Sequence, residues 1–190
     1  MRFLASAALL FFIMPMATVA RTRSPARIDA AELNRRLLAS PSATATLRQW
    51  CAEHGIADPV IHAELLKGPA PAATRRQRQE LQVGPNEPLG YRHVRLSCAG
   101  HVLSDAQNWY VPARLTASMN ASLDSSDTPF GTAVAALHIS RRTLGTEILW
   151  RHGLKPPAQL FRHRALVIDA SGHPIAEVIE TYQRAAVALR

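Results

Sequence analysis

The chain has 190 residues, of which 47% are hydrophobic, 19% charged and 6% aromatic. This composition excludes a disordered chain, and the length provides for one globular domain with a single core. Lysine and arginine total 22 against 14 acidic residues, a formal charge of +8, which favours anionic partners without choosing among nucleic acid, lipid headgroups and small carboxylates. Two cysteines are too few for a scaffold built on disulfides.

The first twenty residues have the layout of a secretory signal. Residues 1–2 are a basic start, residues 3–17 carry no charge, and residues 18–20 offer small side chains for cleavage. The apolar run is shorter than the roughly 20 residues that cross a bilayer as a helix. We therefore expect a cleaved signal over 1–20 and a single domain over 21–190, periplasmic or secreted, with no membrane span left. A start that does not act as a signal would leave the chain in the cytoplasm.

Export would allow Cys51 and Cys98 to oxidise. Two cysteines permit only one intramolecular pairing. The sequence does not show whether their Cα atoms come within about 7 Å of each other, as a disulfide requires. A disulfide and two buried thiols are therefore equal alternatives at this stage.

The chain after the signal predicts helices first and an antiparallel sheet later. We expect helices over 28–39 and 45–54 (the second capped by Ser42 or Thr44), partly over 75–81, over 113–123 and after 128–131. We expect strands over 59–67, 91–98, 102–111, within 137–150, over 160–168 and over 175–182. Successive strands are joined by tight turns, so the predicted class is α+β rather than α/β.

Two charged residues fall on strand faces that otherwise read as core. Alternation places Arg92 on one face with Val94 and Leu96. In the last strand, Glu180 shares a face with Val178 and a tyrosine. A buried arginine stays charged and is costly unless it is paired. One interpretation is structural: Arg92 reaches water at a strand end, or it forms an ion pair with Glu180. The other is an enclosed anion cavity in which Arg92 grips a carboxylate through two hydrogen bonds.

Other kinds of site have little support. The eight histidines show no metal-ligand spacing, so no metal is expected. Nucleophile-elbow and glycine-rich phosphate-binding motifs are absent from the sequence. Basic clusters at 75–78 and 162–164 lack the interleaved aromatic residues of a nucleic-acid surface. We therefore expect neither nucleic-acid binding nor a resident metal.

Several short motifs, in this order and spacing, resemble the chorismate lyase family, most closely its mycobacterial and archaeal branch. The motifs are LNRRL at 33–37, YRHVRL at 91–96, TPFG at 128–131, ALHI at 136–139 and GHPI at 172–175, followed by Glu180. The resemblance implies an antiparallel sheet with helices covering one face and an internal ligand cavity. It also implies conversion of chorismate to 4-hydroxybenzoate and pyruvate without a cofactor.

The same resemblance implies a set of site residues. Arg92 would bind the ring carboxylate, and Glu180 would act at the oxygen end of the ligand, so these two would be the catalytic pair. Phe130 and Ala45 would contact the ligand through their backbone, and Arg164 would be a second cation. Family members usually carry leucine at the position of Phe130.

Two alternatives to the enzyme stay open. Chorismate is cytosolic whereas this chain has a signal-like start, and the same architecture serves as a small-ligand-sensing module in bacterial transcription regulators. The chain could therefore be a non-catalytic exported module that binds small aromatic carboxylates. Binding of nucleic acid or a membrane surface through the arginine-rich stretches rests on net charge alone.

Overall fold

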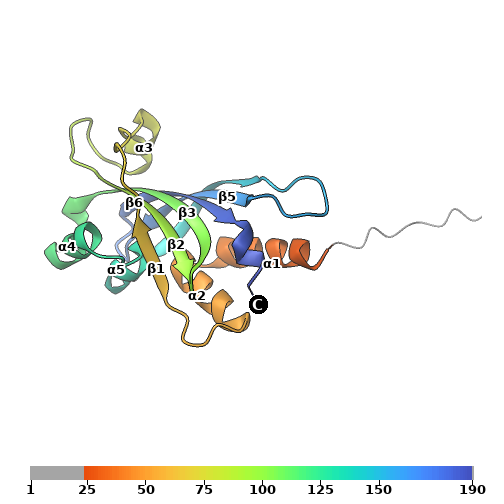
Figure 1. Cartoon of the computed structure of the whole chain (residues 1–190). Coiled ribbons are helices and arrows are strands. Elements are labelled where there is room, and N and C mark those ends of the chain that lie inside the picture. The colour runs from red at the N-terminus through yellow and green to blue at the C-terminus, as the bar shows by residue number, and fades with distance from the viewer. Residues whose placement is uncertain (1–23, 190) are drawn as a thin grey trace, which may run out of the picture.

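The computed structural model describes residues 24–189 (Figure 1), so the signal predicted over residues 1–20 lies outside the described residues. Within that part, no helix is both long enough and apolar enough to cross a membrane. The single domain expected over residues 21–190, the cleavage of the signal and the export of the chain stay predictions.

In the described part of the chain, six antiparallel strands form one sheet in the order β1-β2-β3-β6-β5-β4. The strands are β1 (Ile61–Leu65), β2 (Gly90–Cys98), β3 (His101–Tyr110), β4 (Ser140–Ile148), β5 (Gln159–Ile168) and β6 (Pro174–Gln183). Each lies where the sequence predicts a strand. Tight turns join β2 to β3 and β5 to β6, which is why these neighbours run antiparallel.

Within residues 24–189, five α-helices accompany the sheet. They are α1 (Pro25–Ala39), α2 (Ala43–Glu53), α3 (Arg75–Glu80), α4 (Ala117–Ser125) and α5 (Phe130–Ala133). Figure 1 shows α1, α2, α4 and α5 below the sheet and α3 above it. The α+β class is therefore confirmed. The expectation of helices on one face alone needs correction for α3, because Leu81 at its end packs with Trp109 and Leu166 on the other side of the sheet.

Side-chain caps fix the starts of the helices that matter most for the site. Ser42 is the N-cap of α2, and its hydroxyl accepts a hydrogen bond from the backbone N–H of Ala45 at 3.3 Å. The helix consequently begins at Ala43, two residues before the predicted start. At α3, Thr74 and Gln77 form a reciprocal capping box.

The side of the sheet under α1, α2, α4 and α5 carries most of the core, and we call it the cavity face; the other side is the α3 face. Buried apolar side chains of both α1 and α2 pack on the cavity face, among them Leu33, Leu47 and Trp50. Leu96 of β2 and Tyr182 of β6 meet them from the sheet. This packing holds the helices over the strands that carry Arg92 and Glu180.

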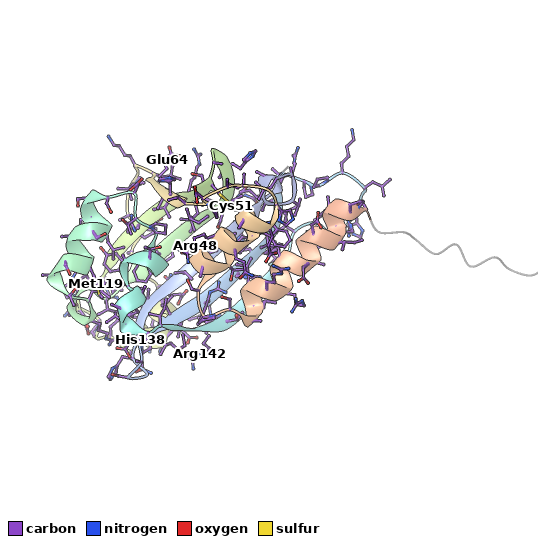
Figure 2. All side chains as sticks on the ribbon, turned by 90° about the horizontal axis from the view of Figure 1, so that it is seen from below. Arg48, Cys51, Glu64, Met119, His138 and Arg142 are labelled. Atoms are coloured by element: carbon purple, nitrogen blue, oxygen red, sulfur yellow. A yellow bond between two sulfur atoms is a disulfide. The ribbon has the colours of Figure 1, made fainter. Side chains whose placement is uncertain are left out.

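A disulfide joins Cys51 of α2 to Cys98 at the end of β2, with Cα atoms 6.8 Å apart. Figure 2 labels Cys51 on the helix-covered side of the sheet. Of the two alternatives left open by the sequence, the structure has the disulfide. It ties the helical layer to the sheet and closes a loop of 47 residues.

Candidate functional site

Arg92 lies on the cavity face and is 3% exposed. Its two terminal nitrogens donate to the backbone carbonyls of Ser126 and Thr128, at 3.2 Å and 3.1 Å, and its Nε has no hydrogen-bond partner among the described residues. Burial lowers the pKa of Arg92, although a guanidinium stays charged at any physiological pH. No ion pair within residues 24–189 includes this side chain. Because Arg92 is only 3% exposed, the interpretation in which its side chain reaches water at a strand end is wrong.

Glu180 is paired with a different arginine. Arg141 of β4 forms an ion pair with the Glu180 carboxylate, and the side chains are 3% and 8% exposed. The Tyr182 hydroxyl donates to the same carboxylate at 3.0 Å. Burial and the neighbouring Glu180 raise the pKa of Tyr182 well above its ordinary value, so the hydroxyl stays a donor. The structural interpretation of an Arg92–Glu180 ion pair is therefore wrong.

A small cavity of about 50 Å³ lies between the sheet and the loops and helices that cover it. Its walls include Arg92, Asn108, Phe130, Arg141 and Glu180. Asn108 stands directly opposite Arg92 in the register of β2 and β3, and its side-chain oxygen is buried without a partner. Two residues with unpartnered polar atoms thus line the same cavity.

The charges around this cavity do not cancel. Two guanidinium groups and one carboxylate give a net charge of +1. Glu180 balances Arg141, so the excess belongs to Arg92. A buried charge of this kind is expensive when the fold supplies only neutral carbonyl partners. The cavity is therefore suited to an anion.

His163 lies next to this network but adds no charge to it at neutral pH. It is fully buried, stands opposite Glu180 across β5 and β6, and its Nε2 is 2.7 Å from the Asn34 side-chain oxygen. Burial and the nearby positive charge of Arg141 lower the pKa of His163 to about 4. The histidine is consequently neutral at pH 7.

The structure brings three of the five predicted site residues together. Arg92, Phe130 and Glu180 all line the cavity. Ala45 instead lines a larger adjoining pocket, outside the start of α2. Arg164 has to be removed from the set because it points to the α3 face, where its guanidinium lies 3.7 Å from the carboxylate of a buried glutamate.

Arg141 is the second cation that the sequence did not identify. Its strand was predicted only as a β-prone stretch over residues 137–150, without an assignment of faces. A bulge between Thr143 and Gly145 interrupts the alternation along this edge strand. Among the described residues, no group of three metal-ligating side chains is assembled.

No family model matches the chain. The uncharacterized protein y4mC of Sinorhizobium fredii (strain NBRC 101917 / NGR234) is 41% identical over 169 residues, which are 79% of this chain and 71% of that protein. The effector domain of PhnF from Mycobacterium smegmatis shares 12% identity at a TM-score of 0.54, over 75% of this chain and 88% of that domain. A structure of PhnF itself shares 13% identity at a TM-score of 0.53, over 76% and 64% of the two chains. Identities this low show a shared fold alone.

These similarities overturn the expected enzyme. The fold expected from the resemblance is present, but the solved structures that share it come from an effector domain and its parent protein, and the 41% identical relative is uncharacterized, so no similarity supports a lyase. The identification as a chorismate lyase, the conversion of chorismate to 4-hydroxybenzoate and the catalytic roles of Arg92 and Glu180 are therefore wrong. The alternative of an exported module for aromatic carboxylates gains no support from them either. The short motifs were a signature of the fold and not of the reaction.

Proposed function

The chain belongs to the same family as the uncharacterized protein y4mC of Sinorhizobium fredii, and from the buried cavity and the fold we propose that it is a ligand-binding domain that takes up a small anion. The observation that carries this proposal is Arg92, a buried guanidinium whose Nε has no hydrogen-bond partner, which lies beside a cavity and forms no ion pair among the described side chains; Asp124, the nearby carboxylate, accepts from Tyr110 instead. A carboxylate placed there would accept charge-assisted hydrogen bonds and supply the missing negative charge.

Asn108 supports the same assignment. It faces Arg92 across two strands, and its amide is buried with an unused oxygen. Rotation of this amide about its last bond turns the NH2 group toward the cavity, where it can donate to an anion. Arg141, already held by Glu180, adds positive potential at the far wall. Both arginines are thus in place before the ligand arrives and only the Asn108 amide has to turn, which keeps the ordering cost of binding small.

The fold agrees with this role. PhnF is described with an effector domain, and that domain shares the present arrangement of sheet and helices. A cavity between a sheet and its covering helices is a common place for a small ligand. The proposal therefore rests on the geometry of Arg92, and the fold shared with the PhnF effector domain is compatible with it.

The experiment measures thermal unfolding and calorimetric binding of the purified chain with acetate and with acetamide, its neutral analogue. Acetate should raise the melting temperature in a concentration-dependent way, because a ligand that binds only the folded state stabilises it by mass action. Acetamide should not. Arg92→Met should abolish the response to acetate, and Arg151→Met, at an exposed position, should preserve it.

Two results would overturn the proposal: equal responses to acetate and acetamide, or a full response in Arg92→Met. Arg92 also holds the carbonyls of Ser126 and Thr128, so its loss could prevent folding. Asn108→Asp then serves as the second variant, because a fixed negative charge in the cavity excludes an anion while leaving the Arg92 contacts in place.

We also propose that the chain is exported after removal of residues 1–20. The Cys51–Cys98 disulfide supports this, because such bonds persist in oxidising compartments. Mass spectrometry of the protein from its native cell should find a chain that begins at Arg21. A chain found only in the cytoplasm, with its first twenty residues intact, would refute export and leave the ligand site unaffected.

A further inference from the structure

A much larger pocket lies immediately outside the small cavity. Its volume is about 550 Å³, within the range of roughly 300–1,000 Å³ that is usual for ligand sites. It is bordered by the start of α2, the chain that leads into β1, and the segment around α5. Figure 2 shows α5 beside α2 on the helix-covered face, with Arg48 labelled on the flank of α2 nearer to α5. The proposed function makes no use of this pocket.

The two spaces are separated by a very thin wall. Ser42, Thr44, Gly131 and Ile139 line both of them. A Cβ atom on Gly131 would lie 2.9 Å from the Thr44 hydroxyl oxygen and 3.2 Å from that of Ser42. Helix α5 therefore rests directly on the first turn of α2, and only these few atoms divide the inner cavity from the outer pocket.

The sizes of the two spaces fit different parts of one molecule. A single water molecule needs about 10–15 Å³ of such space, so the inner cavity of about 50 Å³ holds a head group of a few heavy atoms. The outer pocket is about ten times larger. A molecule that places a carboxylate at Arg92 reaches the outer pocket with its remaining atoms when the side chains of Ser42 and Thr44 in this thin wall turn aside.

Apolar side chains from two segments of the chain line the outer pocket, beside the charged side chains of Arg48 and Asp127. Pro59 and Val60 come from the chain that leads into β1, and Pro129 and Ala135 come from the segment around α5. Val60 is 56% exposed at the edge of this pocket. A ligand with an apolar body would cover it.

We propose that the inner cavity and the outer pocket form one bipartite site, and that the ligand is an amphiphilic acid with a small anionic head group and a larger, partly apolar body. The head group lies at Arg92 and Asn108, and the body lies against Val60. The proposal rests on the proposed function, because the head group uses the same anion site. It adds the class of ligand and a second set of contacts.

The experiment measures the affinity of the purified chain for acetate, butyrate, hexanoate and octanoate by calorimetry. Each added methylene should raise the affinity about fourfold while the chain is being buried. Hexanamide, which has the same body without the charge, should bind far more weakly than hexanoate. The series needs no knowledge of the physiological ligand.

A matched pair of variants assigns the gain to the outer pocket. Val60→Asp should weaken hexanoate binding at least tenfold and leave acetate binding unchanged, because it places a charge only where the body lies. Leu65→Asp is the control: Leu65 is 48% exposed, at the other end of β1, and lines neither space. This second variant should leave the affinities for both acids as they are.

The outcomes separate the two proposals. Acetate binding without a rise along the series would overturn the bipartite site and leave the anion site standing. A rise that Val60→Asp and Leu65→Asp reduce equally would also overturn it, since the body would then lie elsewhere. If none of the acids binds, both proposals fail.

Discussion

Arg92 on the cavity face and Glu177 on the α3 face are both buried, and each has side-chain atoms that make no hydrogen bond. The difference lies in what surrounds them. Glu177 has the guanidinium of Arg164 at 3.7 Å, whereas the guanidinium of Arg92 donates only to backbone carbonyls, lies beside a cavity and makes no ion pair with Asp124, the carboxylate in its neighbourhood. A buried charge indicates a ligand when the fold offers no opposite charge and leaves space next to it.

The α3 face shows how a fold can meet such a charge internally. Glu80 of α3 lies 3.9 Å from three guanidinium groups, those of Arg76, Arg142 and Arg164. Arg164 in turn approaches Glu177. These ion pairs hold helix α3 over Glu177. On the cavity face, Arg92 has no ion-pair partner among the described residues, and the proposed ligand would supply the negative charge.

The largest expected difference between the two faces is a loss of stability at low pH, when His163 on the cavity face becomes protonated. If the cavity face already holds one unmatched cation, a second one at His163 should be costly. The pKa of His163 is about 4 in the folded chain against 6.5 ordinarily, so the unfolded chain binds the proton first as the pH falls. Stability should be intact above pH 6.5 and decline by roughly 3 kcal/mol by pH 4.

Denaturant unfolding at pH 7, 5.5 and 4 measures this loss. His163→Gln should flatten the dependence over this range, because glutamine can still donate to Asn34 but does not titrate. His152→Gln, at an exposed position, should behave as the unsubstituted chain. A dependence that is unchanged in His163→Gln would assign the acid sensitivity to another group.

The next effect comes from giving Arg92 the partner that it lacks. Asn108→Asp places a carboxylate opposite the guanidinium on the neighbouring strand. We expect the ligand-free protein to gain roughly 1–2 kcal/mol in free energy of unfolding, because a charge that is already buried becomes paired. The same variant should lose its response to acetate.

Chemical denaturation with and without acetate measures both changes. Gln107→Glu adds the same charge one residue earlier, on the opposite face of β3, and should preserve the acetate response. An Asn108→Asp protein that is less stable and still binds acetate would show that Arg92 is adequately satisfied without an anion.

The smallest effect is expected on the α3 face. Burial raises the pKa of Glu177, so the unfolded chain releases this proton at a lower pH than the folded chain does. The contribution to stability is therefore complete at low pH and is lost as the pH rises through the raised pKa. Glu177→Gln should become more stable relative to the unsubstituted chain as the pH rises from 4 to 8, by less than the loss expected at His163, because Arg164 offsets part of the cost.

Thermal unfolding across this pH range, with Glu64→Gln as the exposed control, measures the difference. A Glu177→Gln protein that loses stability at pH 8 would mean that the pairing with Arg164 outweighs the cost of burial. The buried charge of the α3 face would then be fully compensated by its internal partner, in contrast to Arg92 on the cavity face.

Much of the cavity could be predicted from local sequence. The period of two along β2 and β6 places Arg92 and Glu180 on core faces, and short turns between strands predict an antiparallel sheet. Both inferences depend only on neighbours in the chain. The structure confirms the fold class, and both side chains line one cavity.

What the sequence does not predict depends on contacts between distant segments. The partner of Glu180 is Arg141, 39 residues away on an edge strand, and a bulge in that strand defeats the simple alternation. Arg164 belongs to the α3 face because its neighbour His163 is the residue opposite Glu180. The function was misjudged for a related reason: motifs that specify a shared fold do not specify a reaction.

The segment that covers Arg92 carries a consequence of its own. Its carbonyls at Ser126 and Thr128 are held from inside by the guanidinium. Asp127 between them is fixed from outside, because its carbonyl accepts from the Ala63 amide at 2.7 Å and its carboxylate lies 2.9 Å from the His62 ring. Residues 126–128 thus connect Arg92 to the edge strand β1. An anion that draws Arg92 away from those carbonyls would loosen this connection. Occupancy of the interior could in this way be sensed at the rim of the sheet by a molecule that never enters it.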